Sequence, residues 1–231
     1  MVRNKKIIIA IGGGGFTHKS DEALDEYVVN QVNKSSISLG FLPTASNDNK
    51  EKIDLFYKRF KSQKFKLSHF NLCTSVEGFH EWLLNKDIIY VGGGNTSEMI
   101  NIWKRHNLIK VFKDAYEKGI ILSGISAGAV CWFDWILSDS VSKELSPLKG
   151  ISFLHGSCTP HSSNNNRLLQ FISEIKDGNL PDGIAIDDGV AVLFIDGVPS
   201  EVYSSRINHD AYYVTKDDKI SLKTYIKKLN G

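Results

Sequence analysis

The sequence contains little cysteine and no closely spaced pair of thiols. Its three cysteines, Cys73, Cys131 and Cys158, are far apart and form no C-x-x-C pair. An odd number of scattered cysteines offers no thiol pair for a metal or redox centre. No cluster of His, Cys, Asp or Glu has metal-ligand spacing either. We therefore expect structural thiols in a reducing compartment, no metal and no cofactor.

The sequence also lacks an excess of charge and a long apolar run. Lys and Arg number 28 against 26 Asp and Glu, and the formal net charge is +2. The basic residues are scattered, whereas a nucleic-acid groove shows a basic stripe with interleaved aromatics. The first apolar run, residues 7–11, is too short for a secretion signal or a membrane span. We expect a cytoplasmic protein without a nucleic-acid or membrane partner.

Short apolar runs that end at glycine or turn residues alternate with longer segments of helical period. This alternation predicts an α/β sandwich with a parallel sheet covered on both faces. The length of 231 residues and the hydrophobic content of 42% suffice for one core, so we expect one domain over residues 1–231. Strands are predicted at 7–11, 38–42, 88–91, 120–123, 184–186 and 191–195, and helices at 21–32, 50–60, 97–103, 108–118 and 166–175. Residues 183–198 predict an antiparallel extension, and residues 139–165, which lack a clear period, predict a functional loop.

A G-x-S-x-G motif follows the predicted strand at 120–123. It is centred on Ser126 and precedes small residues that open a predicted helix at 130–133. A serine on a sharp strand-to-helix turn projects its oxygen beyond the sheet, and flanking glycines permit the tight backbone. The helix start adds N–H groups beside a developing oxyanion. Ser126 is therefore the candidate nucleophile; the alternative is a turn that only connects two elements.

A nucleophilic serine needs a neighbouring base, and the sequence contains seven histidines. His155 and His161 flank a short Gly-Ser-Cys-Thr-Pro stretch downstream of Ser126. We favour His161, because Pro160 restricts the residue before it and helps to fix the loop. The remaining histidines lie in polar, helical or terminal contexts typical of solvated side chains: His18, His69, His80, His106 and His209.

Two glycine runs follow predicted strands. Gly92, Gly93 and Gly94 stand between a strand and a helix, where the backbone can approach a ligand with its N–H groups exposed. A phosphate-binding loop is the competing interpretation, but neither G-K-[ST] nor G-x-G-x-x-G is present. The run at 12–15 fails the dinucleotide pattern as well, and we interpret it as a tight turn after the first strand.

Three motifs together resemble the peptidase E (dipeptidase E) family. They are G-I-S-A-G-A around Ser126, V-G-G-G-N-T at 91–96 and T-P-H at 159–161, while I-G-G-G-G-F-T at 11–17 is similar to the bacterial Peptidase E-like branch. The resemblance spans about the first 200 residues. It implies a three-layer α/β fold with a mainly parallel sheet, like that of class I glutamine amidotransferases. It further implies metal-independent hydrolysis of small peptides and, in the founding members, a preference for N-terminal aspartate.

The resemblance assigns roles to single residues. Ser126 corresponds to the nucleophile, His161 to its base, and the glycines at 92–94 with the amide of Ala127 to the oxyanion site. Two aspartates stay open as the third member of the triad. We place Asp188 first, because two apolar runs would anchor it, whereas Asp139 lies in a polar serine-rich segment. The alternative for Asp188 is a hairpin-turn residue, since Asp-Gly is a common turn pair.

The segment after the base departs from the family pattern. Family members that take N-terminal aspartate carry a stretch containing glycine and glutamate, with an arginine that pairs with the substrate carboxylate. This chain has S-S-N-N-N-R at 162–167. Arg167 could pair with the substrate carboxylate in its place, because a guanidinium suits bidentate recognition of a carboxylate. The alternative is a solvated arginine at the start of a helix.

The leading interpretation is a serine peptidase, monomeric or homodimeric, that hydrolyses dipeptides or short peptides near the N-terminus. A cyanophycinase-like exopeptidase, which handles aspartate–arginine polymers, is a second hypothesis, although a longer chain is typical of it. A non-catalytic binding module of the same fold is a third. Candidates for a complete triad favour an enzyme, and a serine-labelling fluorophosphonate probe separates the two classes, because a binding module should not react.

Overall fold

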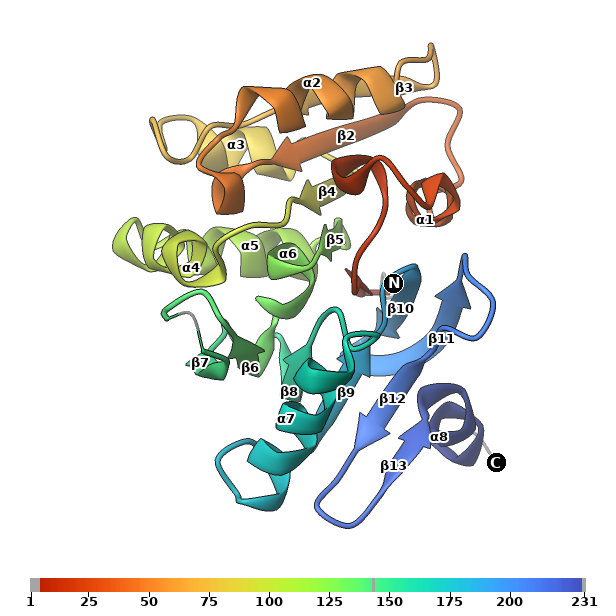
Figure 1. Ribbon diagram of the computed structural model, residues 1–231. Helices are drawn as coiled ribbons and strands as arrows, with labels where there is room; N and C mark the ends of the chain where they lie inside the picture. Colours follow the sequence, from red (N-terminus) through yellow and green to blue (C-terminus); the bar gives the residue numbers. More distant parts are fainter. Residues whose placement is uncertain (1–4, 143, 230–231) are drawn as a thin grey trace.

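The computed structural model describes residues 5–142 and 144–229 and contains two β-sheets surrounded by helices (Figure 1). The first sheet has seven strands in the order β11-β10-β1-β5-β4-β2-β3. In this sheet β1, β5, β4, β2 and β3 run parallel to one another. In contrast, β10 pairs antiparallel with both β1 and β11. Their bounds are β1 Ile7–Ile11, β2 Ile37–Leu42, β3 Phe65–His69, β4 Ile88–Val91, β5 Ile121–Ile125, β10 Val190–Ile195 and β11 Val198–Ser204.

Both faces of the first sheet are covered by helices. Ile9 and Ile11 of β1 pack on one face with α1 (Glu22–Val29) and α2 (Lys50–Arg59). Ile8 and Ala10 pack on the other face with α3 (Phe79–Leu84), α4 (Thr96–Arg105) and α5 (Leu108–Glu117). A strand buried on both sides is apolar at every position, which explains the continuous apolar runs of the sequence. The arrangement confirms the predicted α/β sandwich.

The second sheet has six strands in the order β13-β12-β9-β8-β6-β7. Ile136 and Ile184 on one face join the core of the first sheet, while Leu137 and Ala185 on the other face contact α7 (Asn165–Lys176). The strands are β6 Phe133–Ser138, β7 Ser146–Lys149, β8 Leu154–Thr159, β9 Gly183–Ile186, β12 Ala211–Val214 and β13 Lys219–Ser221, and α8 spans Leu222–Leu229. Among the described residues, none of the helices combines the length and apolarity needed to cross a membrane.

The predicted strands are all present with small shifts at their ends, but two sequence-based expectations are wrong. The stretch 139–165 is not one loop, because it contains β7 and β8. The helix after Ser126 is only the four-residue α6 (Ala127–Val130), and β6 begins at Phe133. β6 belongs to the second sheet because it pairs with β8. Pairing with a distant segment does not produce a hydrophobic period within the strand's own sequence, so the strand was not predicted. The antiparallel extension is confirmed, since β10 pairs antiparallel with β1 and β11.

One edge of the first sheet collects the glycine-rich segments. The parallel strands β1, β4 and β5 all end there, at Ile11, Val91 and Ile125, and each is followed within three residues by at least one glycine. The antiparallel β10 begins at the same edge, with Ala191 opposite Ile11. The segment that links β9 to β10 reaches this edge too, because Gly13 forms an isolated bridge with Asp188. Residues from both sheets therefore meet at this edge.

Candidate active site

Ser126 occupies a strained turn between β5 and α6. Its backbone has φ 54° and ψ −113°, a conformation rare for residues other than glycine. The motif glycines permit close packing here: a Cβ on Gly124 would lie 2.2 Å from the carbonyl oxygen of Gly128, and one on Gly128 would lie 2.3 Å from that of Val91. The Ser126 N–H donates to the carbonyl of Ile11 at 2.9 Å. The turn thus fixes the serine at the glycine-rich edge.

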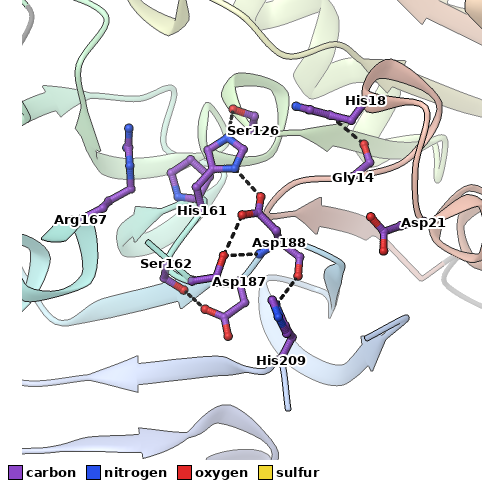
Figure 2. Close-up of polar contacts among 12 residues, drawn as sticks. Gly14, His18, Asp21, Ser126, His161, Ser162, Arg167, Asp187, Asp188 and His209 are labelled. Carbon is purple, nitrogen blue, oxygen red and sulfur yellow. Dashed lines mark hydrogen bonds and ion pairs between the residues drawn. The ribbon is translucent and has the colours of Figure 1, made fainter. Parts of the chain in front are cut away.

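His161 reaches Ser126 from the end of β8 in the second sheet (Figure 2). Its Nε2 lies 2.9 Å from Oγ of Ser126, and its Nδ1 lies 2.6 Å from Oδ1 of Asp188. An ionised carboxylate only accepts hydrogen bonds, so Nδ1 carries the ring proton. In the neutral ring Nε2 is then free to accept the hydroxyl proton of Ser126.

Asp188 lies on the connection between β9 and β10. Its Oδ2 accepts a hydrogen bond from Oγ of Ser163 at 2.7 Å, while Oδ1 faces His161. The hydrogen bond from His161 lowers the pKa of Asp188 to about 2, so the carboxylate is ionised at neutral pH. The hairpin interpretation of Asp188 is wrong, because β9 and β10 belong to different sheets.

Asp139, the second candidate acid, has a different partner. Its Oδ2 lies 2.9 Å from Nη2 of Arg167, and its side chain is 57% exposed. Arg167 is in the first turn of α7, and its side chain is only 12% exposed, which corrects the interpretation as a solvated arginine. The structure therefore brings Ser126, His161 and Asp188 together and pairs Asp139 with Arg167. The reason is topological, because Asp139 follows β6 and faces the start of α7.

The glycines at 92–94 divide into different roles. The N–H of Gly92 donates to the carbonyl of Leu42 at 2.9 Å and is therefore not available to a ligand, which corrects its inclusion in the oxyanion site. Within the described residues, the N–H groups of Gly93, Gly94 and Ala127 have no protein acceptor. Gly93 lies against Ser126, since a Cβ there would be 3.3 Å from Cβ of Ser126. Gly93 and Ala127 are thus the best placed donors to an oxyanion.

A small pocket of about 130 Å³ opens beside Ser126 and His161. Arg167 and Asp139 contribute charged groups to its wall, and Thr96, Val130, Leu137 and Pro160 also line it. A larger hollow of about 580 Å³ lies at the amino ends of strands in the first sheet. Ser126, His161 and Asp188 do not line it. In the part of the chain described, no group of three or more His, Cys, Asp or Glu could hold a metal ion.

Gly13, His18 and Ser163 belong to this site although the sequence analysis gave none of them a role in it. A Cβ on Gly13 would lie 1.8 Å from Oδ1 of Asp188, so the contact requires glycine. His18 is solvent-exposed, as the sequence indicated, but its ring lies 6.2 Å from that of His161. The glycine run after the first strand was the available clue, because β1 and β5 are parallel neighbours whose ends must share an edge.

Comparison with known proteins places the chain in a family of peptidases. The model of Peptidase family S51 matches residues 8–201. The uncharacterized peptidase YgaJ of Bacillus subtilis (strain 168) is 38% identical over 212 residues, which cover 90% of this chain and 92% of that protein.

Two crystal structures share the fold. A peptidase from an acI-B1 Actinobacterium has a TM-score of 0.70 at 14% identity, over 95% of this chain and 98% of that one. A putative peptidase E protein from Listeria monocytogenes EGD-e has a TM-score of 0.63 at 18% identity, over 88% of this chain and 100% of that one. The family match covers most of the chain, and it rests on the sequence rather than on the fold alone. The chain belongs to peptidase family S51.

Proposed function

We propose that this peptidase is a serine-type enzyme that hydrolyses dipeptides or short peptides near their N-terminus. Ser126 is the nucleophile, His161 is its general base, and Asp188 orients His161. The observation that carries the proposal is the unbroken pair of hydrogen bonds, 2.9 Å from Ser126 to His161 and 2.6 Å from His161 to Asp188. A nucleophile, a base and an orienting carboxylate in this order are the constellation of acyl transfer.

The proposed reaction has two halves. Oγ of Ser126 attacks the peptide carbonyl while Nε2 of His161 takes the hydroxyl proton, and Asp188 stabilises the imidazolium that forms. The oxyanion accepts hydrogen bonds from the N–H groups of Gly93 and Ala127. His161 then gives its proton to the departing amine, which leaves an acyl group on Ser126. Water, activated by His161 in the same way, hydrolyses this ester.

The pocket beside Ser126 supports a substrate with a free N-terminal residue. Its volume of about 130 Å³ suits one small amino-acid side chain rather than a longer peptide segment. Arg167 and Asp139 place a cation and an anion 2.9 Å apart at its wall. An N-terminal aspartate carries the complementary pair, a side-chain carboxylate for Arg167 and an α-ammonium for Asp139. We therefore propose that Asp139 binds the substrate ammonium and that N-terminal aspartate is preferred.

We also propose that the enzyme acts in the cytoplasm. Cys73, Cys131 and Cys158 are free, and Cys131 and Cys158 are buried. Free thiols persist in a reducing compartment.

The nucleophile is tested by Ser126→Ala together with a fluorophosphonate probe. The wild-type protein should be labelled on Ser126 alone, and the variant should lose on the order of 10^6 in turnover while its circular dichroism stays unchanged. Ser123→Ala is the matched control, because its Oγ donates to the carbonyl of Ile89 inside the sheet, away from His161. A Ser126→Ala protein that keeps more than a small fraction of the wild-type rate contradicts the proposal.

The substrate preference is tested by Arg167→Ala and Arg167→Lys. Removal of a buried charged contact costs roughly 2–5 kcal/mol in binding. Arg167→Ala should therefore slow peptides with N-terminal aspartate and spare neutral ones. Arg167→Lys should retain part of the preference, since it keeps the charge but not the bidentate geometry. Equal losses on acidic and neutral peptides would assign Arg167 a purely structural role.

A further inference from the structure

His18 is a second histidine at the active site, and the mechanism proposed above leaves it unused. It ends the short 3-10 helix η1 (Phe16–His18), which follows β1 and the glycine run. Its ring centroid is 6.2 Å from that of His161, and the two planes meet at 67°. In Figure 2 the ring lies on the opposite side of the Ser126–His161 pair from Arg167. His18 is also not among the residues that line the pocket.

The loop beneath His18 holds the ring in place. Phe16 is 3% exposed, and its ring packs within 5.0–5.9 Å of those of Phe41, Phe56 and Tyr90. Lys52 donates from Nζ to the carbonyl of Thr17 and thereby ties the loop to α2. A group presented by such a fixed turn loses little conformational freedom when it binds a substrate, which suits a functional contact.

The hydrogen bonds of His18 define its tautomer. Nδ1 lies 2.9 Å from the carbonyl oxygen of Gly14, and a carbonyl can only accept, so Nδ1 carries the proton. Partial desolvation lowers the pKa of His18 and outweighs the hydrogen bond to the carbonyl of Gly14, which raises it; the positive charge of Lys52 lowers the pKa further, and the charge of Asp188 opposes it. The neutral ring therefore presents an unprotonated Nε2, a hydrogen-bond acceptor, and Figure 2 shows this end of the ring toward Ser126.

The two sides of the Ser126–His161 pair receive different parts of the substrate. In the proposed function the acyl residue occupies the pocket with Arg167, so the departing part of the peptide extends to the other side. His161 supplies the proton to the departing nitrogen, so that nitrogen must lie close to its Nε2. An acceptor on this side meets the N–H that the departing nitrogen already carries.

We propose that His18 is a specificity-determining residue for the leaving group: its Nε2 accepts a hydrogen bond from the N–H of the scissile amide while the C–N bond breaks. This inference rests on the proposed serine mechanism. His18 neither gains nor loses a proton in the step. The Ser126 Oγ–C bond forms, the C–N bond breaks, and the hydroxyl proton of Ser126 reaches the departing nitrogen through His161. The contact selects substrates whose leaving nitrogen carries an N–H over esters and over peptides with proline after the scissile bond.

The inference is tested with a matched pair of substrates that share the acyl residue and differ in the leaving group, a dipeptide and the corresponding ester. The kcat/KM for each reports events up to formation of the acyl enzyme. His18→Ala should lower kcat/KM for the dipeptide about 10- to 100-fold, as for loss of one strong hydrogen bond, and leave the ester nearly unaffected. His18→Gln should restore part of the loss, because its side-chain carbonyl can accept near the place of Nε2. His80→Ala, an exposed histidine on α3, is the control and should change neither rate.

Two results would overturn the inference: unchanged dipeptide hydrolysis in His18→Ala, or equal losses on dipeptide and ester. The second result would indicate that His18 only supports the loop. Labelling by a fluorophosphonate probe separates this failure from a failure of the proposed function. Fluoride leaves without an N–H, so His18→Ala should be labelled at the wild-type rate. If wild-type Ser126 is not labelled at all, the serine mechanism itself is wrong, and the inference falls with it.

Discussion

Replacing Asp188 by asparagine removes the charge behind His161 while keeping the size of the side chain. In the wild type Oδ1 of Asp188 lies 2.6 Å from Nδ1 of His161 and keeps the ring proton on that nitrogen. The other oxygen, Oδ2, accepts a hydrogen bond from Oγ of Ser163 at 2.7 Å. An introduced amide can turn its NH2 group toward Nδ1. Nδ1 must then accept, which moves the ring proton to Nε2, where it faces Ser126 and blocks proton removal.

The expected loss is large because two effects coincide. The productive tautomer is no longer enforced, and no carboxylate stabilises the imidazolium. Loss of the orienting charge in such a triad costs on the order of 10^4 in turnover, or about 5 kcal/mol of transition-state stabilisation. The pKa of Asp188 is lowered to about 2, so the carboxylate keeps its charge at any pH suited to the assay.

The assay compares kcat for a dipeptide in Asp188→Asn and Asp139→Asn. Both changes are chemically identical, but Asp139 pairs with Arg167 and its side chain is 57% exposed. Asp139→Asn should act mainly on KM and leave kcat within a few-fold of wild type. Circular dichroism and thermal unfolding serve to check that both variants are folded. The reasoning is refuted if Asp139→Asn shows the large loss of kcat while Asp188→Asn stays nearly as active as wild type.

Three further predictions concern other parts of the molecule. Gly13→Ala should lower kcat about 10^2-fold or more without unfolding the protein, because its Cβ would lie 1.8 Å from Oδ1 of Asp188. The control Gly178→Ala introduces a Cβ that meets nothing within 4 Å; the positive φ of 76° at this position costs stability, but kcat should stay at the wild-type value. Burial raises the pKa of Asp25 from 3.8 to about 6, so its protonated form stabilises the fold and that contribution is lost as pH rises through about 6. The unfolding free energy of Asp25→Asn should therefore improve relative to wild type between about pH 4 and pH 7, and a constant difference would contradict this. EDTA should leave peptide hydrolysis unchanged, and a loss reversed by added zinc would disprove the metal-independent mechanism.

The sequence was most informative where local chemistry determines local structure. Parallel strands that are buried on both faces appear in the sequence as continuous apolar runs. For this reason β1 and β4 were predicted with their observed bounds, Ile7–Ile11 and Ile88–Val91. The strand, G-x-S-x-G and helix order likewise placed Ser126 at the edge of the sheet. Here Gly124 is required by a backbone contact that is close in the sequence, that with the carbonyl of Gly128.

Features that depend on contacts between distant segments could not be predicted in this way. The stretch 139–165 lacks a period because β7 and β8 gain their structure by pairing with β6. The ranking of Asp188 over Asp139 rested on anchoring by apolar runs, which the structure does provide, but the partner of Asp139 is an arginine on α7 that no spacing rule connects to it. His18 resembled any solvated histidine, because its neighbour His161 is more than 140 residues away in the chain.

The position of the three central residues explains why the site needs both sheets. Ser126 follows β5 of the first sheet, His161 follows β8 of the second, and Asp188 lies on the link from β9 to β10, which passes from the second sheet to the first. The 2.9 Å separation of Ser126 and His161 is therefore set by how the sheets pack. One continuous core spans them, with Ile8 and Val192 of the first sheet in the same cluster as Ile136 and Ile184 of the second. Because close-packed cores resist small displacements, this shared core keeps Ser126 and His161 at their hydrogen-bonding distance.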